Sequence, residues 1–219
     1  MVYDAVFRLV FIGLFASVMT MRLYFRYRGG LLFEGAVREL RREVRWLLGL
    51  RCVLGLPWFF AALCWIFRPQ WVAWSMMSLP LWLRSTGLLL ATLGLVVLWW
   101  SHRALGRNFS ATPRIRSGHV LVVNGPYQWV RHPMYVAFLT MLLGAGLLAD
   151  SWFLGLTGPS LIVAAMILRT PREEEQLEAT FGEAYREYVR RTGAFLPRLA
   201  PRAVGRVPVL ELQGPSEGR

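Results

Sequence analysis

Five long apolar runs constrain this chain more than any other feature of its sequence. A helix needs roughly 20 residues to cross a bilayer core about 30 Å thick. A soluble domain of 219 residues rarely needs 55% hydrophobic residues and ten tryptophans. We therefore expect an all-α integral membrane protein with about five transmembrane helices. The predicted spans are Ala5–Phe25, Trp46–Phe67, Thr86–Ala104, Met134–Ala149 and Trp152–Leu168.

The segments between and after these runs have their own patterns. Only Asp150 and Ser151 separate the last two runs, which predicts a tight helical hairpin. Leu31–Leu50 is amphipathic and is expected to lie on the inner leaflet. Trp71–Leu83 is aromatic but interrupted by Pro80, so we expect an interfacial or re-entrant segment. The run after Arg172 predicts a soluble C-terminal helix, on the cytoplasmic side, with a bend at Gly182.

Three parts of the chain follow from this organisation. Residues 1–84 hold the first transmembrane helices and the amphipathic connection. Residues 85–197 hold the core that carries the polar motifs. Residues 198–219 are rich in proline, glycine and charge, and are expected to be disordered.

Arginine distribution predicts the orientation in the membrane. The formal charge is +12, and all 25 basic residues are arginines. The successive connections hold six, two, five, none and nine of them, so rich and poor segments alternate. The positive-inside rule then places the N-terminus outside and the C-terminus inside. Because the arginines flank apolar runs, we expect membrane lipids as partners and no nucleic acid. A prokaryotic inner membrane is the expected location, with the active site facing the cytoplasm.

Two polar clusters lie on the predicted cytoplasmic side. Gly125–Tyr135 packs two prolines, two tyrosines, an arginine and a histidine between apolar runs, and Arg169–Glu175 follows the last span. Arginine and histidine are costly in the bilayer core, and prolines break helices. Both clusters therefore belong where helices meet water, and together they indicate an active site at a membrane face.

Other motifs are weaker. Gly144-x-Gly146 superficially matches a dinucleotide fingerprint, but it lies in a predicted membrane helix, where small residues favour close helix packing. The chain has no Gly-x-Ser-x-Gly elbow and no P-loop, which argues against a serine hydrolase and a kinase. The three histidines have no metal-ligand spacing around them, so no metal site is predicted.

The loop and tail together resemble the isoprenylcysteine carboxyl methyltransferase family and the related phospholipid N-methyltransferases. The matching pattern is His119-x-Leu121, Gly125-Pro126-Tyr127, Arg131-His132-Pro133-x-Tyr135, Arg169-x-x-x-Glu173-Glu174 and Phe195-Leu196-Pro197. It covers about residues 85–197. The resemblance implies a membrane methyltransferase that uses S-adenosylmethionine and a lipid-like small-molecule acceptor from the bilayer.

The resemblance also implies roles for individual residues. The residues that match cofactor-binding positions are His119, Leu121, Gly125, Tyr127, Arg131, His132, Pro133, Tyr135, Glu173 and Glu174. Those that match catalytic positions are Arg169, on the acceptor side, and Glu174. Two residues depart from the family pattern. Ala137 stands where the signature usually has glycine, and Pro171 interrupts the stretch from Arg169 to Glu173.

Elementary chemistry leads in the same direction. Glu173 or Glu174 can bind the ammonium or ribose hydroxyls of the methyl donor, and Arg131 or His132 its carboxylate. Methyl transfer is an in-line displacement that depends on positioning and desolvation. A carboxylate or thiolate acceptor needs no base, whereas an amine could give its proton to a glutamate or Tyr127.

Two other functions remain open at this point. Membrane sterol reductases resemble this architecture and would bind a nicotinamide cofactor. A non-enzymatic transporter or assembly protein is the other, although a transporter should carry more polar residues in its spans. The sequence predicts neither the acceptor nor the oligomeric state.

Overall fold

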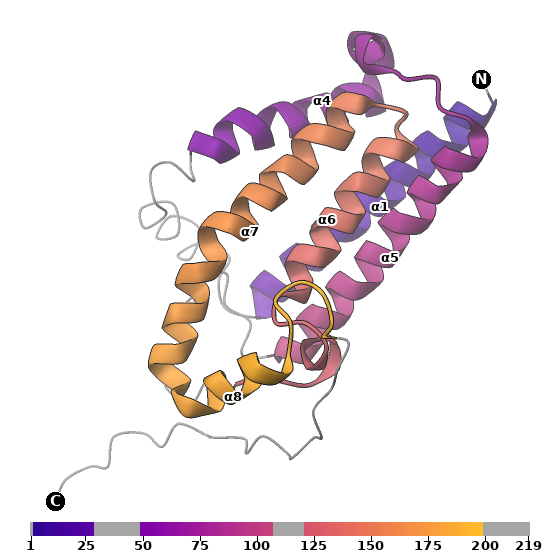
Figure 1. The fold of residues 1–219 in the computed structure, drawn as a ribbon. Coiled ribbons are helices and arrows are strands. Elements are labelled where there is room, and N and C mark those ends of the chain that lie inside the picture. Colours follow the sequence, from indigo (N-terminus) through magenta and orange to yellow (C-terminus); the bar gives the residue numbers. More distant parts are fainter. Residues whose placement is uncertain (1, 29–48, 107–120, 199–219) are drawn as a thin grey trace, which may run out of the picture.

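The computed structural model describes residues 2–28, 49–106 and 121–198. These residues form a helical bundle (Figure 1), and the β pairing among them is limited to two isolated bridges. His119, nearly all of Leu31–Leu50 and nearly all of 198–219 lie outside the described residues. The described elements are α1 (Val2–Arg28), η1 (Arg51–Gly55), α4 (Leu56–Phe67), η2 (Pro69–Ser75), α5 (Leu81–Leu105), η4 (Gly125–Gln128), α6 (Pro133–Leu148), α7 (Trp152–Phe181) and α8 (Glu183–Arg191).

The all-α membrane class is confirmed. Three helices are long and apolar enough to cross a membrane, at Asp4–Phe25, Leu81–Leu105 and Trp152–Phe181. Arg51–Phe67 and Pro133–Leu148 are shorter apolar helices. α1, α5, α6 and α7 run along the bundle, and the N-terminus lies at the end opposite α8 (Figure 1).

Glycines set the close packing of α5, α6 and α7. A Cβ on Gly144 would lie 2.5 Å from the Ala91 nitrogen on α5. A Cβ on Gly146 would lie 2.2 Å from the Gly155 Cα on α7. Such backbone approach is how small residues drive helix association in a bilayer, so the packing interpretation of these glycines is confirmed. Ala137 is buried against α5 and packs with Met21 and Leu98, and it therefore faces the bundle core.

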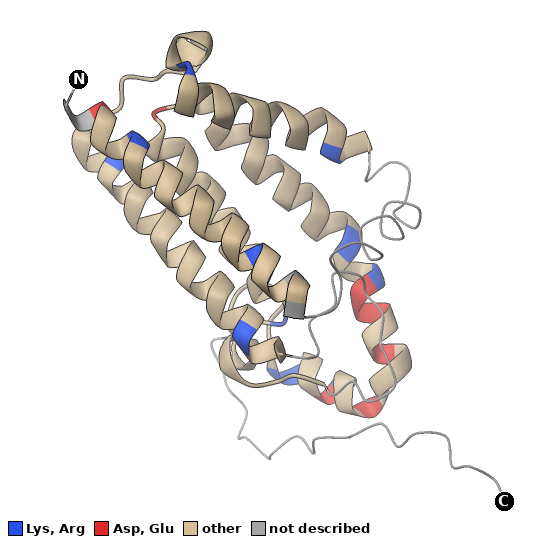
Figure 2. Cartoon of the chain, turned by 180° about the vertical axis from the view of Figure 1, so that it is seen from behind, with Lys and Arg blue, Asp and Glu red and all other residues tan. Residues whose placement is uncertain are grey.

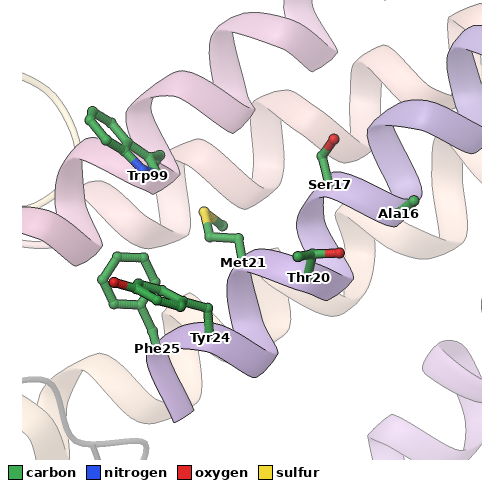
Figure 3. Close-up of a pocket in the computed structure, with 7 residues that line it drawn as sticks. All are labelled: Ala16, Ser17, Thr20, Met21, Tyr24, Phe25 and Trp99. Carbon is green, nitrogen blue, oxygen red and sulfur yellow. The ribbon is translucent and has the colours of Figure 1, made fainter. Parts of the chain in front are cut away.

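α1 and α4 complete the bundle on its other sides. Phe11 of α1 stacks against Trp65 of α4 with ring centroids 4.9 Å apart. An open groove of about 450 Å³ runs between α1 and α5, lined by residues that include Tyr24, Phe25 and Trp99 (Figure 3). None of the residues in the two polar clusters lines this groove.

A polar cap closes the end of the bundle that holds the N-terminus of α1. Trp71–Leu83 does not form a sixth span. It forms most of η2, an extended stretch, and the first residues of α5. The Leu79 nitrogen donates to Asp150 Oδ1 at 2.8 Å, and the hydroxyls of Ser75 and Ser151 are 2.8 Å apart. The predicted hairpin at Asp150 and Ser151 is thereby confirmed and tied to the chain before α5.

Arg84 belongs to the same cap. Its Nη1 lies 2.7 Å from Asp4 Oδ1, its Nε and Nη2 donate to the Leu148 carbonyl at 3.3 Å, and its guanidinium lies over the Phe7 ring. Only 8% of the Arg84 surface is exposed, so the charge is buried among protein partners.

The last span differs from the prediction. α7 does not end at Leu168 but continues through Pro171 to Phe181, for 30 residues. Membrane helices tolerate an internal proline because one missing hydrogen bond leaves the rest of the helix intact. A helix of that length spans about 45 Å. The charged C-terminal part of α7, from Arg169 onward, therefore extends past a bilayer core. Gly182, at φ +52°, ends α7 and begins α8, which confirms the predicted bend.

Candidate active site

The candidate site lies where the chain before α6 meets the charged part of α7, at the end of the bundle that carries α8. Acidic residues gather on this part of α7 and on α8 (Figure 2). The first residue of the Gly125-Pro126-Tyr127 motif begins η4. Gly125 has φ +61°, and a Cβ there would lie 3.1 Å from the Ala104 Cβ. Only glycine adopts that backbone without strain, so η4 can pack directly on α5.

The segment after η4 is held by the C-terminal chain. Val130 and Gly193 form a parallel β-bridge. The Arg131 nitrogen donates to the Gly193 carbonyl at 2.8 Å, and the His132 nitrogen donates to the Ala194 carbonyl at 3.0 Å. The Arg131 guanidinium also donates to the Thr192 carbonyl. These bonds fix the backbone from which the Arg131 and His132 side chains project.

Glu174 is the centre of the first cluster. Arg131 Nε donates to Glu174 Oε1 at 2.9 Å, and His132 Nε2 lies 3.0 Å from the same oxygen. The hydrogen bonds from His132 and then Arg131 lower the pKa of the Glu174 carboxyl to about 2. Glu174 lies beyond the apolar part of α7 and is ionised at neutral pH. Because Arg131 and His132 already contact its carboxylate, Glu174 chiefly orients these two side chains.

Glu173 is the centre of the second cluster. Its Oε1 accepts from the Tyr135 hydroxyl at 3.1 Å and lies 3.2 Å from Arg169 Nη2. Its Oε2 lies 3.9 Å from His132 Nδ1, which joins the two clusters through one imidazole. Arg169 and Glu173 stand four residues apart on a continuous helix. Pro171 therefore leaves their spacing intact, contrary to the interruption that the sequence suggested.

Aromatic rings cover both clusters. The Phe195 ring centroid lies 5.6 Å from that of His132 and 6.5 Å from that of Tyr135. Phe195 comes from the segment that pairs with Val130–His132, so one piece of chain both fixes the backbone and shields the polar groups. Shielding of this kind strengthens electrostatic interactions inside a site.

Two buried hydroxyls beside the clusters lack hydrogen-bond partners among the described residues. They are the Tyr185 hydroxyl on α8 and Thr170 Oγ1 on α7. Tyr185 is 2% exposed and Thr170 is 7% exposed. Burial, and then the charge of Glu174, raise the pKa of the Tyr185 phenol, whereas the neighbouring Arg131 guanidinium lowers it. The Tyr185 hydroxyl thus faces Arg131 without forming a hydrogen bond of normal geometry. A buried polar atom without a partner costs free energy, so a ligand that bonded these hydroxyls would recover it.

The structure divides the predicted site residues into two groups. Six lie together with their charged or polar atoms in contact, namely Arg131, His132, Tyr135, Arg169, Glu173 and Glu174. The other described residues support them. Leu121 packs against Phe181, Tyr185 and Tyr188. Pro133 begins α6 and is buried.

Tyr127 belongs to the supporting group. Its carbonyl accepts a hydrogen bond from the Tyr188 hydroxyl at 2.6 Å. Burial raises the pKa of its phenol above the usual range, which makes Tyr127 unsuitable as a proton acceptor.

Sequence reasoning missed several residues of this region. Tyr185 and Thr170 were not assigned roles, and neither was Thr192. Tyr185 stood in an amphipathic pattern that is equally typical of a solvent-exposed helix. Nothing in the local sequence pairs residues 130–132 with 193–194, because that contact joins segments about 60 residues apart.

Comparison with known proteins finds a family that this region resembles. Residues 86–179 match the sequence model of the isoprenylcysteine carboxyl methyltransferase (ICMT) family. The human protein-S-isoprenylcysteine O-methyltransferase is 30% identical over 133 residues, which are 60% of this chain and 47% of that protein. The cobalt-zinc-cadmium resistance protein CzcN of Cupriavidus metallidurans is 38% identical over 88 residues, 39% of each chain. The chain thus spans about half or less of the length of these relatives.

The fold comparison agrees. The solved structure of the eukaryotic intramembrane Ras methyltransferase ICMT superposes with a TM-score of 0.50, at 22% identity, over 86% of this chain and 67% of that one. At that identity the match concerns the fold. Residues 86–179, across α5, α6 and most of α7, are therefore similar to the isoprenylcysteine carboxyl methyltransferase family, and the chain shares the fold of a solved member of that family.

Proposed function

We propose that this protein is a membrane-bound methyltransferase that takes a methyl group from S-adenosylmethionine and transfers it to a lipid-like acceptor. The observation that carries the proposal is the joined pair of clusters around Glu173 and Glu174, with the unbonded Tyr185 hydroxyl beside them. The membrane helices beside the clusters would admit an apolar acceptor from the bilayer.

The residues present fit the methyl donor. S-adenosylmethionine has a carboxylate, an ammonium, a sulfonium and ribose hydroxyls. Arg131 and His132 can bind the carboxylate, and Glu174 holds both side chains in place. Tyr185 and Thr170 offer hydroxyls that lack partners among the described residues. Glu173, shared between Tyr135 and Arg169, is placed for a cation or for the ribose.

The protein's chemical task would be small. When bound, S-adenosylmethionine supplies an electrophilic methyl group. Arg169 then holds the acceptor next to the donor site, and Phe195 keeps water away from His132 and Tyr135. Orientation and desolvation are the effects that such a site can provide. With a carboxylate or thiolate acceptor no proton needs to move.

Binding of the demethylated product tests the proposal. We expect detergent-purified protein to bind S-adenosylhomocysteine with a stoichiometry near one in calorimetry, and to gain thermal stability by mass action. NADPH at the same concentration is the control for a reductase. Stabilisation by NADPH without any effect of S-adenosylhomocysteine would reject the methyltransferase. Transfer of a labelled methyl group into lipid extract would then identify the class of acceptor.

We also propose that the site faces the cytoplasm of a prokaryotic cell. The alternation of arginines supports this orientation. Met77 is exposed in the polar cap, at the end of the bundle opposite α8, and Glu183 is exposed on α8. In a protein with Cys52 and Cys64 replaced by serine, an impermeant thiol reagent applied to intact cells should label Met77→Cys and spare Glu183→Cys. The reverse pattern would refute the orientation.

A further inference from the structure

The start of α4 brings an arginine toward the acceptor side of the site. α4 runs antiparallel to α7 along a tight contact. Trp58 Nε1 donates to the Leu154 carbonyl at 3.1 Å, and a Cβ on Gly158 would lie 2.6 Å from the same nitrogen. A Cβ on Gly55 would lie 3.3 Å from Leu161 Cδ2. The N-terminal end of α4 therefore points toward the charged C-terminal part of α7.

Arg51 stands four residues before Gly55 and so lies about 6 Å further in that direction. The guanidinium groups of Arg51 and Arg169 are close enough to Tyr135 to act electrostatically on its phenol. Arg51, Arg169 and Tyr135 therefore converge from three helices, and Glu173 is bonded to the last two.

The local backbone at Arg51 is unusual. Arg51–Gly55 forms a π-helical turn, and such turns occur frequently at functional sites. Apolar side chains flank this region. Val53 is exposed on η1 and Leu56 on α4, and Ile167 and Leu168 are exposed on α7. Two cations beside an exposed apolar surface suit an amphiphile that has one anionic group and a hydrocarbon tail.

We propose that Arg51 is an acceptor-binding residue that works with Arg169 to select an anionic group on an apolar chain. This rests on the proposed function. It also assigns part of the site to a helix outside residues 86–179, the stretch that matches the family. The acceptor carboxylate oxygen forms a bond to the methyl carbon of the sulfonium. The carbon–sulfur bond breaks, its electron pair stays on sulfur, and a neutral ester and a thioether result without proton transfer.

The test compares two probes that differ in charge. They are S-farnesyl-N-acetylcysteine, which carries a carboxylate, and its primary amide, which is neutral. Each is titrated into protein saturated with S-adenosylhomocysteine, and its affinity is measured. Arg51→Met should weaken binding of the acid roughly ten- to a hundredfold, as expected for a lost charge-assisted bond. Affinity for the amide and for S-adenosylhomocysteine should not change.

Two further variants make the test specific. Arg51→Lys keeps the charge and should restore part of the affinity for the acid. Arg68→Met removes an exposed arginine from the other end of the same helix and should have no effect. An equal loss for acid and amide would show a structural role and overturn the inference. The inference would also be overturned if the parent protein bound the acid and the amide with equal affinity. A parent that fails to bind S-adenosylhomocysteine would instead reject the proposed function.

Discussion

The two ends of this bundle both bury polar groups, but they satisfy them differently. At the far end, Arg84 and Asp150 have protein partners. The guanidinium is bonded to Asp4 and Leu148, and the carboxylate accepts from Leu79. Arg8, one turn further into the bundle, has no hydrogen bond at Nε within the described part of the chain, but its guanidinium lies over the Trp65 ring. At the other end the bonded network of Glu174 and Glu173 adjoins two hydroxyls that have no partner among the described residues.

The difference separates a structural cap from a candidate binding site. A buried network in which each member is satisfied adds rigidity and stability. A network that borders unsatisfied groups leaves stabilisation available to a ligand. Substitutions at the far end should therefore change stability alone, and substitutions near Glu174 should change affinity.

The largest effect is expected from Arg84→Leu. This change removes the bonds that Arg84 donates to the Leu148 carbonyl and to Asp4, and it should lower the free energy of unfolding by about 2–4 kcal/mol. Thermal unfolding in detergent would measure the loss. Affinity for S-adenosylhomocysteine should stay within about twofold of the parent below the melting temperature. A large loss of affinity in the folded variant would mean that the two ends are coupled.

Glu174→Gln should show the opposite behaviour. A neutral amide cannot keep the charge-assisted bonds from Arg131 and His132, so these side chains lose their fixed positions. We expect a loss of roughly 1.5–3 kcal/mol in cofactor affinity, about ten- to a hundredfold. Titration calorimetry with S-adenosylhomocysteine provides the measurement. Glu175→Gln, at the exposed next position of α7, is the matched control.

His132→Ala extends the same test, because it removes the group that joins the two clusters. Cofactor affinity should fall here as well. If both variants bind like the parent, the site lies elsewhere.

Two tyrosines of α8 sharpen the comparison further. The Tyr185 hydroxyl has no partner among the described residues, whereas the Tyr188 hydroxyl donates to the Tyr127 carbonyl at 2.6 Å. Tyr185→Phe should keep or raise the melting temperature and weaken cofactor binding by about 0.5–1.5 kcal/mol. Tyr188→Phe should lower stability by about 1 kcal/mol. Finding a lower melting temperature and unchanged affinity in Tyr185→Phe would contradict the proposal.

The last expected effect is a pH dependence of stability. The pKa of Glu174 is about 2 in the folded protein and near 4.5 without its partners. Because the folded value is the lower one, the stabilisation is complete above about pH 4.5 and is lost as the pH falls toward 2. After solvent screening it amounts to about 1–2 kcal/mol. Acid titrations of the parent and of Glu174→Gln should differ in this window, and identical curves would exclude the effect.

Periodicity and composition predicted much of this fold. Apolar length predicted α1, α5 and the hairpin of α6 and α7, and small residues predicted the contact at Gly144 and Gly146. The motif pattern predicted that the cluster with Arg131 and His132 and the cluster with Glu174 would form one site, but not the direct bonds between them. The local reasoning failed at Pro171, because a proline costs a helix about one hydrogen bond and the other residues of the 30-residue α7 keep theirs.

Other features depended on contacts between distant segments. The pairing of Val130 with Gly193 has no local signal, because an isolated bridge has no repeating pattern. The cap around Asp150 was missed for a similar reason. Its partner Leu79 lies in a stretch whose aromatic composition indicated only an interfacial position.

The length of α7 has a consequence for the lipid environment. The same rigid rod contains the membrane-buried stretch and both carboxylates, so bilayer thickness sets how far Glu173 and Glu174 stand from the headgroups. A hydrophobic stretch adapts to a thicker or thinner membrane by tilting or by deforming the bilayer, at a modest cost per ångström. Acyl-chain length in reconstituted vesicles should therefore tune the encounter between a water-borne donor and a bilayer-borne acceptor, with an optimum where hydrophobic thickness matches the apolar part of the rod.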